Sequence, residues 1–180
     1  LGGNDQIDGA AGVDTAVFRS AVANLSINTI EGLSTIRGNY AAGEHAYSTT
    51  RLWNVEKIKT YDGTQALSSA SISPIIGTLQ NDVLIGTAGA DVLDGMGGTD
   101  FIDGASGNDT LVLFTTKEKF TVLTVSGVTR IKASADASEY AGHTIKTTHV
   151  ENLAFTQSQS KALETTNDAV LFGTSGANGL

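Results

Sequence analysis

The chain has 180 residues, with 19 acidic and 11 basic side chains and a net charge of -8. This balance argues against nucleic acid as a partner, because phosphate binding needs clustered Lys and Arg. The absence of cysteine excludes disulfides and thiolate zinc sites. No run of about 18 apolar residues is present, so no membrane span is expected.

The N-terminus carries two short segments rich in glycine and aspartate. Residues 2–8 and 9–17 place Asp5 and Asp14 after glycine-containing turns, in a frame of nine residues that recurs further along the chain. The first residues do not resemble a signal peptide, so we expect any export signal to lie outside this segment.

Residues 19–67 predict antiparallel β structure. Residues 25–30 and 33–36 are strand-forming and are joined by Glu31-Gly32, a typical hairpin turn. A further strand is predicted at residues 53–58, with Trp53 in the core. Residues 68–76, rich in Ser, are expected to be a surface linker.

Four copies of a nine-residue pattern follow in register. Glycine occupies place one, aspartate place six and an aliphatic residue place eight. Glycine permits tight turns, aliphatic residues can stack into a narrow core, and carboxylates beside turn carbonyls form the oxygen environment that Ca²⁺ prefers. Because residues 60–116 contain no Lys, Arg or His, these carboxylates need a cation from elsewhere if they lie close together. The place-six residues are Asp82, Asp91, Asp100 and Asp109.

This segment resembles the calcium-binding nonapeptide of RTX (repeats-in-toxin) proteins. The resemblance implies a parallel β-roll in which each turn uses two nonapeptides and calcium lies between loops two repeats apart. It implies that Asp82 shares an ion with Asp100, and Asp91 with Asp109. Asp94 and Asp103, at place nine, are then expected to be solvated strand ends. The other implied ligands are carbonyls at places one and three, Gly77, Leu79, Gly86, Ala88, Gly95, Gly97, Gly104 and Ser106, and the incomplete sites of Asp5, Asp14 and Asn178.

A second repeat has a period of 95 residues. It aligns residues 8–58 with 103–153 without a gap and predicts a second hairpin at residues 120–132. Val55-Glu56 matches Val150-Glu151, and we interpret the two glutamates as structural hydrogen-bond acceptors or a solvated edge rather than a carboxylate pair. His143 and His149 are interpreted as surface residues, with a metal pair as the alternative.

The predicted fold is therefore all-β, with parallel β-roll blocks alternating with small antiparallel modules that cap exposed strand edges. The open repeat frame at both ends suggests a segment of a longer tandem array. The predicted units are residues 1–18, the end of a roll; 19–67, the first module; 68–76, the linker; 77–114, the roll; 115–163, the second module; and 164–180, the start of another roll.

The predicted function is calcium-driven folding and stiffening, without catalysis. No nucleophile elbow or phosphate loop is present. The resemblance adds type I secretion from a Gram-negative bacterium and an extracellular or cell-surface location. Two interpretations stay open: a spacer, adhesin or surface-layer segment, and the non-catalytic calcium-binding part of a secreted protease, lipase, epimerase or toxin. The expected partners are calcium ions and neighbouring copies in an array or filament, with a glycan as a weaker option.

Overall fold

The computed structural model describes residues 4–67 and 72–156 and is all-β. Asn178, the predicted roll start at 164–180 and part of the predicted linker lie outside the described residues. Within the described part of the chain, no helix is long and apolar enough to cross a membrane.

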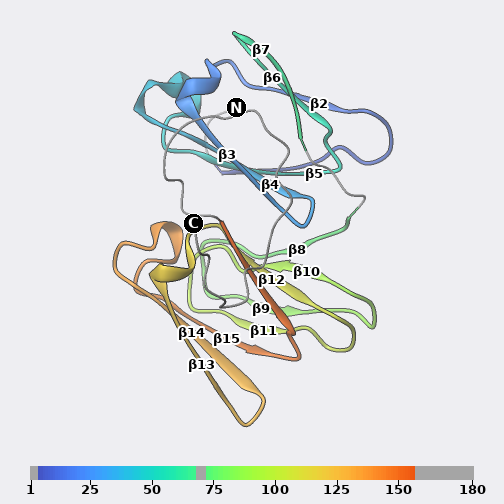
Figure 1. Ribbon diagram of the computed structural model, residues 1–180, viewed down its shortest axis with the longest axis vertical. Helices are drawn as coiled ribbons and strands as arrows, with labels where there is room; N and C mark the ends of the chain where they lie inside the picture. Colours follow the sequence, from blue (N-terminus) through green and yellow to red (C-terminus); the bar gives the residue numbers. More distant parts are fainter. Residues whose placement is uncertain (1–3, 68–71, 157–180) are drawn as a thin grey trace, which may run out of the picture.

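The strands and short 3₁₀ helices divide into two halves, drawn in blue to teal and in green to orange (Figure 1). The first half contains β1 (Asp5–Asp8), β2 (Thr15–Val17), η1 (Val22–Asn24), β3 (Leu25–Ile30), β4 (Leu33–Gly38), η2 (Tyr40–His45), β5 (Thr49–Trp53), β6 (Lys57–Thr60) and β7 (Gly63–Ala66). The second half contains β8 (Ile75–Ile76), β9 (Val83–Ile85), β10 (Val92–Asp94), β11 (Phe101–Asp103), β12 (Thr110–Leu113), η3 (Lys117–Lys119), β13 (Phe120–Val125), β14 (Val128–Ala133), η4 (Ser138–Tyr140), β15 (Thr144–Thr148) and β16 (Asn152–Phe155).

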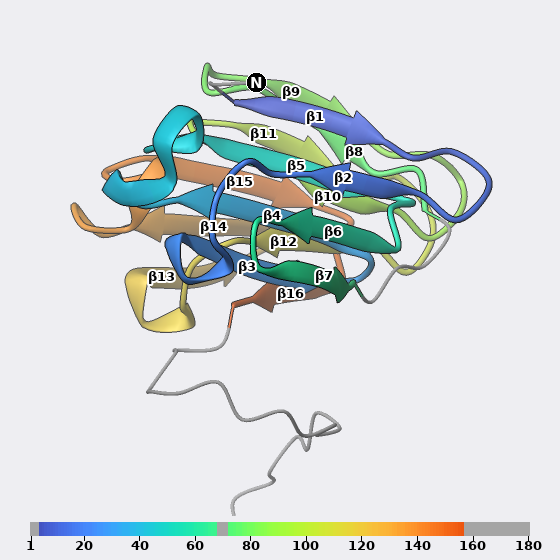
Figure 2. The ribbon, with the colours of Figure 1, turned by 90° about the horizontal axis from the view of Figure 1, so that it is seen from above.

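Four sheets stack as layers, which Figure 1 shows from the side; in Figure 2, seen from above, the strands of the layers overlap. Their strand orders are β2-β6-β7, β1-β5-β4-β3, β16-β12-β10-β8 and β13-β14-β15-β11-β9. Buried apolar side chains join each sheet to the next: Ile58 and Leu52 in the first core, Leu33 and Val112 in the second. The third core contains Leu93, Leu111 and Ile102. The third sheet is therefore buried on both faces.

The nonapeptide strands alternate between the third and fourth sheets, and each lies parallel to the strand two repeats further along. Val83 of β9 pairs with Phe101 of β11, and Val92 of β10 pairs with Thr110 of β12. The place-eight residues Leu93, Ile102 and Leu111 are fully buried in the core between these sheets. The predicted inward orientation of place eight is confirmed at these three positions.

The 95-residue repeat has a direct structural counterpart. The hairpins β3–β4 and β13–β14 have the same lengths, and their turns have positive φ at both central residues: 49° and 81° at Glu31-Gly32, and 51° and 78° at Ser126-Gly127. This is the type I′ conformation that suits a two-residue hairpin. Both predicted hairpins are confirmed.

The run predicted as a single strand at residues 53–58 is interrupted by a turn, and the second half contains the same turn. Asn54 and His149 have φ values of 53° and 50°, so the chain turns there. β5 and β15 end before the turn and β6 and β16 begin after it.

Strands from the module ranges continue the nonapeptide sheets. Phe101 of β11 pairs in parallel with Lys146 of β15, and Leu111 of β12 pairs with Leu153 of β16. The β13–β14 hairpin then adds to β15 in antiparallel register. It therefore covers a strand edge that would otherwise be open to association. Ile75–Ile76, at the end of the predicted linker range, pairs with β10.

A buried arginine joins the two halves. The side chain of Arg51 in β5 is fully buried; its Nε lies 2.8 Å from Asp94 Oδ2 and its Nη2 lies 2.6 Å from Glu139 Oε1. Its guanidinium carbon is 5.0 Å from the centroid of the Phe114 ring. Burial would lower the pKa of Arg51, but the charges of Asp94 and Glu139 raise it above its ordinary value. The expectation that Asp94 is a solvated strand end is wrong, because this junction encloses it completely.

Replacing Arg51 should destabilise the protein strongly. Arg51→Ala leaves Asp94 and Glu139 as charges without their buried partner, and removing one member of such a pair costs about 3–5 kcal/mol. Lys146→Ala is the matched control, because Lys146 occupies the corresponding position of the second half but is exposed. Urea denaturation at fixed calcium concentration measures both; equal free energies of unfolding for the two variants would contradict this role.

Candidate metal centre

The place-six aspartates form two columns along the stacked loops. The Asp82 N–H donates to Asp100 Oδ1 at 3.0 Å, and the Asp91 N–H donates to Asp109 Oδ1 at 2.9 Å. These are the two pairs that the family resemblance implies. The structure therefore brings together aspartates that are 18 residues apart in the chain, with the backbone of one bonded to the carboxylate of the other.

Hydrogen bonds within single loops also hold the aspartate carboxylates of each column. The Thr78 N–H donates to Asp82 Oδ2 at 2.7 Å, and the Thr87 N–H donates to Asp91 Oδ2 at 2.6 Å. Both threonine hydroxyls approach the same carboxylates. These bonds fix each carboxylate across its own loop.

Oxygen atoms from successive loops converge beside the place-one glycines. A Cβ added to Gly86 would stand 2.9 Å from Asp91 Oδ2 and 2.3 Å from the carbonyl oxygen of Gly104. At Gly77, the corresponding distances are 2.8 Å to Asp82 Oδ2 and 2.9 Å to the carbonyl oxygen of Gly95. Glycine is needed at these two positions because of the close approach, and at both of them a carboxylate oxygen and a carbonyl oxygen lie beside the glycine.

The columns contain buried oxygens without donors. Within the described residues, Asp14 Oδ2, Asp100 Oδ2 and Asp109 Oδ2 are buried and have no hydrogen-bond partner. Burial raises the pKa of Asp100 to about 6, and the neighbouring Asp82 charge acts in the same direction. An unpaired buried acceptor is costly, and a cation with a preference for oxygen would remove that cost.

The donor set fits calcium rather than a metal bound only by side chains. In the described part of the chain, no three His, Cys, Asp or Glu side chains gather as a metal site. A carboxylate pair together with loop carbonyls is the hard oxygen environment of a Ca²⁺ site. The predicted ligands therefore fit a calcium ion, and their assignment as ligands stays a prediction.

The remaining predicted ligands occupy varied surroundings. Leu79 is 46% exposed, a Cβ on Gly97 would stand 2.6 Å from the carbonyl oxygen of Glu139, and the Ser106 N–H donates to the carbonyl oxygen of Thr87. Asp5 lies in β1, opposite Thr50. Ala88 lies in the exposed part of its loop. At Gly95, the atoms nearest to an added Cβ belong to Asp100 and Ile102. Beyond Asp100, the column of Asp82 and Asp100 therefore has no loop carbonyl of the described residues among the atoms nearest to the glycine, unlike the column of Asp91 and Asp109.

The place-nine aspartates have a structural role that the sequence analysis missed. Each accepts a hydrogen bond from the backbone N–H two residues later, and that residue has positive φ. The pairs are Asp8 with Ala10, Asp94 with Met96 and Asp103 with Ala105. The two-residue spacing is typical of an Asx turn and was the available signal.

His149 acts as a surface residue beside one of these turns. Its Nδ1 lies 2.8 Å from Asp103 Oδ1, and its side chain is 66% exposed. This hydrogen bond lowers the pKa of Asp103. The observed partner of His149 is thus a carboxylate.

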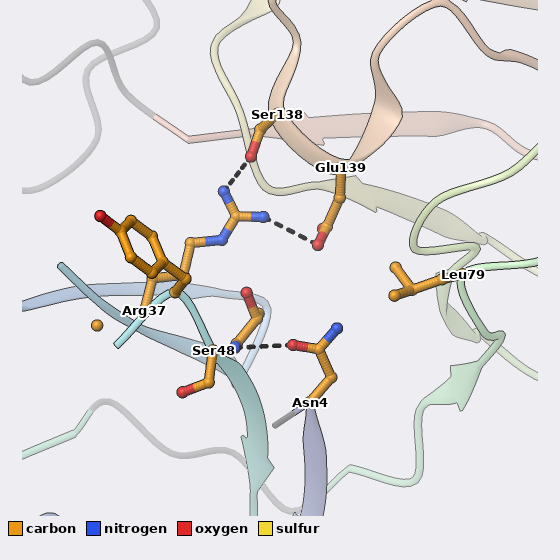
Figure 3. Close-up of a pocket in the computed structure, with 9 residues that line it drawn as sticks. Asn4, Arg37, Ser48, Leu79, Ser138 and Glu139 are labelled. Atoms are coloured by element: carbon orange, nitrogen blue, oxygen red, sulfur yellow. Dashed lines mark hydrogen bonds and ion pairs between the residues drawn. The ribbon is translucent and has the colours of Figure 1, made fainter. Parts of the chain in front are cut away.

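A cavity of about 540 Å³ lies at the junction of the halves, and Leu79 of the first nonapeptide loop is among the residues that line it (Figure 3). Arg37 and Glu139, the charged residues that line it, pair with each other at 2.9 Å, and Arg37 also donates to Ser138. Asn4 Oδ1 accepts the Thr49 N–H at 2.9 Å. The cavity is thus a polar seam between the halves, and we assign no chemistry to it.

The fold and the loop geometry define a segment of stacked nine-residue repeats with oxygen-rich loops. The repeats are RTX calcium-binding nonapeptide repeats: the family model of that description matches residues 1–16 and 76–111, in four copies. No curated protein matches the chain. Among solved structures, the chain is similar to the extracellular lipase LipA from Serratia marcescens, with 13% identity and a TM-score of 0.30. The match covers 83% of this chain and 32% of the lipase, so the chain spans about a third of that protein.

Gly86 and Gly89 offer a test of the loop stacking within one nonapeptide. Gly86→Ala puts a methyl group against the Gly104 carbonyl, and overpacking of this kind costs about 1–3 kcal/mol. Gly89→Ala is the control, because the nearest atom to its added Cβ would be Thr87 Oγ1 at 3.7 Å. Thermal melting in saturating calcium should show a lower melting temperature for the first variant only; similar melting temperatures would mean that the loops do not stack as described.

Proposed function

We propose that this chain is an extracellular structural segment whose nonapeptides form a parallel β-roll that folds and stiffens when calcium binds. The observation that carries the proposal is the convergence of carboxylate and carbonyl oxygens from loops two repeats apart, including buried oxygens without donors. In this proposal one ion lies between Asp82 and Asp100 and another between Asp91 and Asp109, with loop carbonyls completing each site.

The chain's own residues explain why folding would depend on the ion. The nonapeptide strands β9, β10 and β11 have three residues each, so they bury little apolar surface to offset the entropy lost on ordering. Without a cation, the stacked carboxylates also repel one another. Calcium supplies positive charge between loops when bound, so its binding free energy becomes folding free energy.

The expected setting of this segment is outside the cell. Extracellular calcium modules bind with dissociation constants of roughly 10⁻⁴–10⁻³ M. Such an affinity would leave the repeats loose in the cell and ordered after secretion. Type I secretion from a Gram-negative bacterium is part of the same proposal and rests on the family resemblance.

A spacer, adhesin or surface-layer segment is the favoured role within this proposal. The 95-residue repeat supports it, since the two copies stack through an apolar core and the buried Arg51 junction. Such docking suits an extended array of copies. The alternative is the non-catalytic calcium-binding part of a secreted enzyme or toxin, which a catalytic domain in the same polypeptide would favour.

Calcium removal should unfold the repeats. We expect far-UV circular dichroism to show β structure in millimolar calcium and a loss of that signal when a chelator is added. Magnesium at the same concentration should not restore the signal, because Mg²⁺ demands a tighter geometry and keeps its water ligands. Identical spectra with calcium and with chelator would refute calcium-driven folding.

The calcium affinities of two single variants should distinguish a calcium ligand from an acidic surface residue. Asp91→Asn removes one proposed ligand charge, whereas Glu118→Gln removes one charge from an exposed residue. We expect at least a tenfold weaker calcium affinity for the first variant and an unchanged affinity for the second, measured by isothermal titration calorimetry. Equal effects would show that net charge alone attracts the ion.

A further inference from the structure

Two glutamates outside the nonapeptides take the position of the next place-six aspartate. The Asp91 N–H donates to Asp109 Oδ1, and the Asp109 N–H donates in turn to Glu151 Oε2 at 2.8 Å. In the first half, the Asp14 N–H donates to Glu56 Oε2 at 2.7 Å. Glu151 therefore follows Asp109 in the column as Asp109 follows Asp91.

A backbone carbonyl also lies at this position of the column, beside Gly104. A Cβ added to Gly104 would stand 2.6 Å from Asp109 Oδ2 and 1.8 Å from the carbonyl oxygen of His149. This arrangement matches that at Gly86, where Asp91 Oδ2 and the Gly104 carbonyl converge. The turn at His149 thus presents a carbonyl where another nonapeptide would present its place-one carbonyl.

The first half repeats the turn carbonyl of this arrangement, whereas the Asp14 atom nearest to a Cβ added to Gly9 is the Asp14 Cβ, at 3.1 Å, and not a carboxylate oxygen. A Cβ added to Gly9 would stand 1.9 Å from the carbonyl oxygen of Asn54, and Asn54 has the same left-handed conformation as His149. The corresponding strands also agree, because β2 pairs with β6 as β12 pairs with β16. Two independent copies therefore place a glutamate and a turn carbonyl beside a place-six aspartate.

An unpaired buried oxygen lies at each step. Asp109 is fully buried, its Oδ1 accepts the Asp91 N–H, and no donor among the described residues reaches its Oδ2. That oxygen lies beside Gly104, where the His149 carbonyl approaches. Asp14 Oδ2 is likewise buried and has no hydrogen-bond partner within residues 4–67 and 72–156. Neither oxygen therefore has a hydrogen-bond donor among the described residues.

We propose that Glu151 and Glu56 are calcium ligands outside the nonapeptides: Glu151 extends the column of Asp91 and Asp109, and Glu56 forms a site of the same kind beside Asp14 in the first half. One ion would lie between Asp109, Glu151 and the His149 carbonyl, and another between Asp14, Glu56 and the Asn54 carbonyl. The inference rests on the proposed function, since it adds sites to the same calcium columns. In this proposal each glutamate binds calcium in addition to accepting the hydrogen bond from the aspartate backbone N–H.

These sites would join segments that lie further apart in the sequence than the loops joined by the nonapeptide sites. The partners Asp109 and Glu151 are separated by 42 residues, as are Asp14 and Glu56. The intervening residues form the β13–β14 hairpin and the β3–β4 hairpin, respectively. Each added ion would therefore fasten the returning strand to the nonapeptide loop after the hairpin excursion.

Glutamine substitutions test this assignment in the whole chain. Glu151→Gln and Glu56→Gln keep a side-chain oxygen that can accept the aspartate N–H but remove the ligand charge. Native mass spectrometry and isothermal titration calorimetry with calcium should show one fewer bound ion for each variant and two fewer for the double variant. Glu118→Gln, an exposed control, should bind as many ions as the unaltered chain.

Two further comparisons make the outcome decisive. A full complement of calcium in both single variants would overturn the proposal, and so would an equal drop in melting temperature in calcium and in magnesium, since the glutamates would then act through the hydrogen bond alone. Failure of the unaltered chain to bind calcium would instead refute the proposed function. Loss of ions in Asp91→Asn but not in Glu151→Gln would leave the proposed function standing and remove only this inference.

Discussion

The close stacking of acidic loops is the constraint on which the rest of this chain depends. Carboxylate oxygens of one loop and carbonyl oxygens of the loop 18 residues later approach the same place-one glycine. Backbone N–H groups donate to one oxygen of each aspartate, but Asp100 and Asp109 each keep a second, buried oxygen that has no donor among the described residues. A nearby positive charge would stabilise these buried oxygens. No side chain among the described residues donates a hydrogen bond to them, and a divalent cation from solution can supply the charge.

The hairpins are compatible with this stacking because the strands that follow each hairpin pair in register with the nonapeptide strands. After β13–β14, β15 pairs with β11 and β16 pairs with β12, in the parallel sense of the nonapeptide strands. The turn at His149 contains a left-handed residue, as do the loops at Met96 and Ala105. An excursion can therefore be inserted into the stack without ending it, and its hairpin covers a sheet edge.

The nine-residue pattern predicts local geometry well and long-range contacts poorly. The spacing of place eight predicted the buried Leu93 and Ile102, and two-residue turns predicted both hairpins, because these features depend on neighbours in sequence. The pattern could not reveal that Asp94 meets Arg51, which lies in another sheet. Nor could it reveal Glu151 in the column, because the separation from Asp109 is 42 residues rather than a multiple of nine.

Asp94 links the docking of the halves to the order of a nonapeptide loop. Its Oδ2 accepts the Arg51 Nε–H, while its Oδ1 accepts the Met96 N–H inside the loop that leads to Asp100. A disordered loop would release Met96 and move the carboxylate that Arg51 needs, and an undocked Arg51 would leave Asp94 as a buried charge without its partner. Ordering of the loop and docking of the first half therefore favour each other. A cation that stabilises the Asp100 loop would, by this linkage, also stiffen the junction between the two copies.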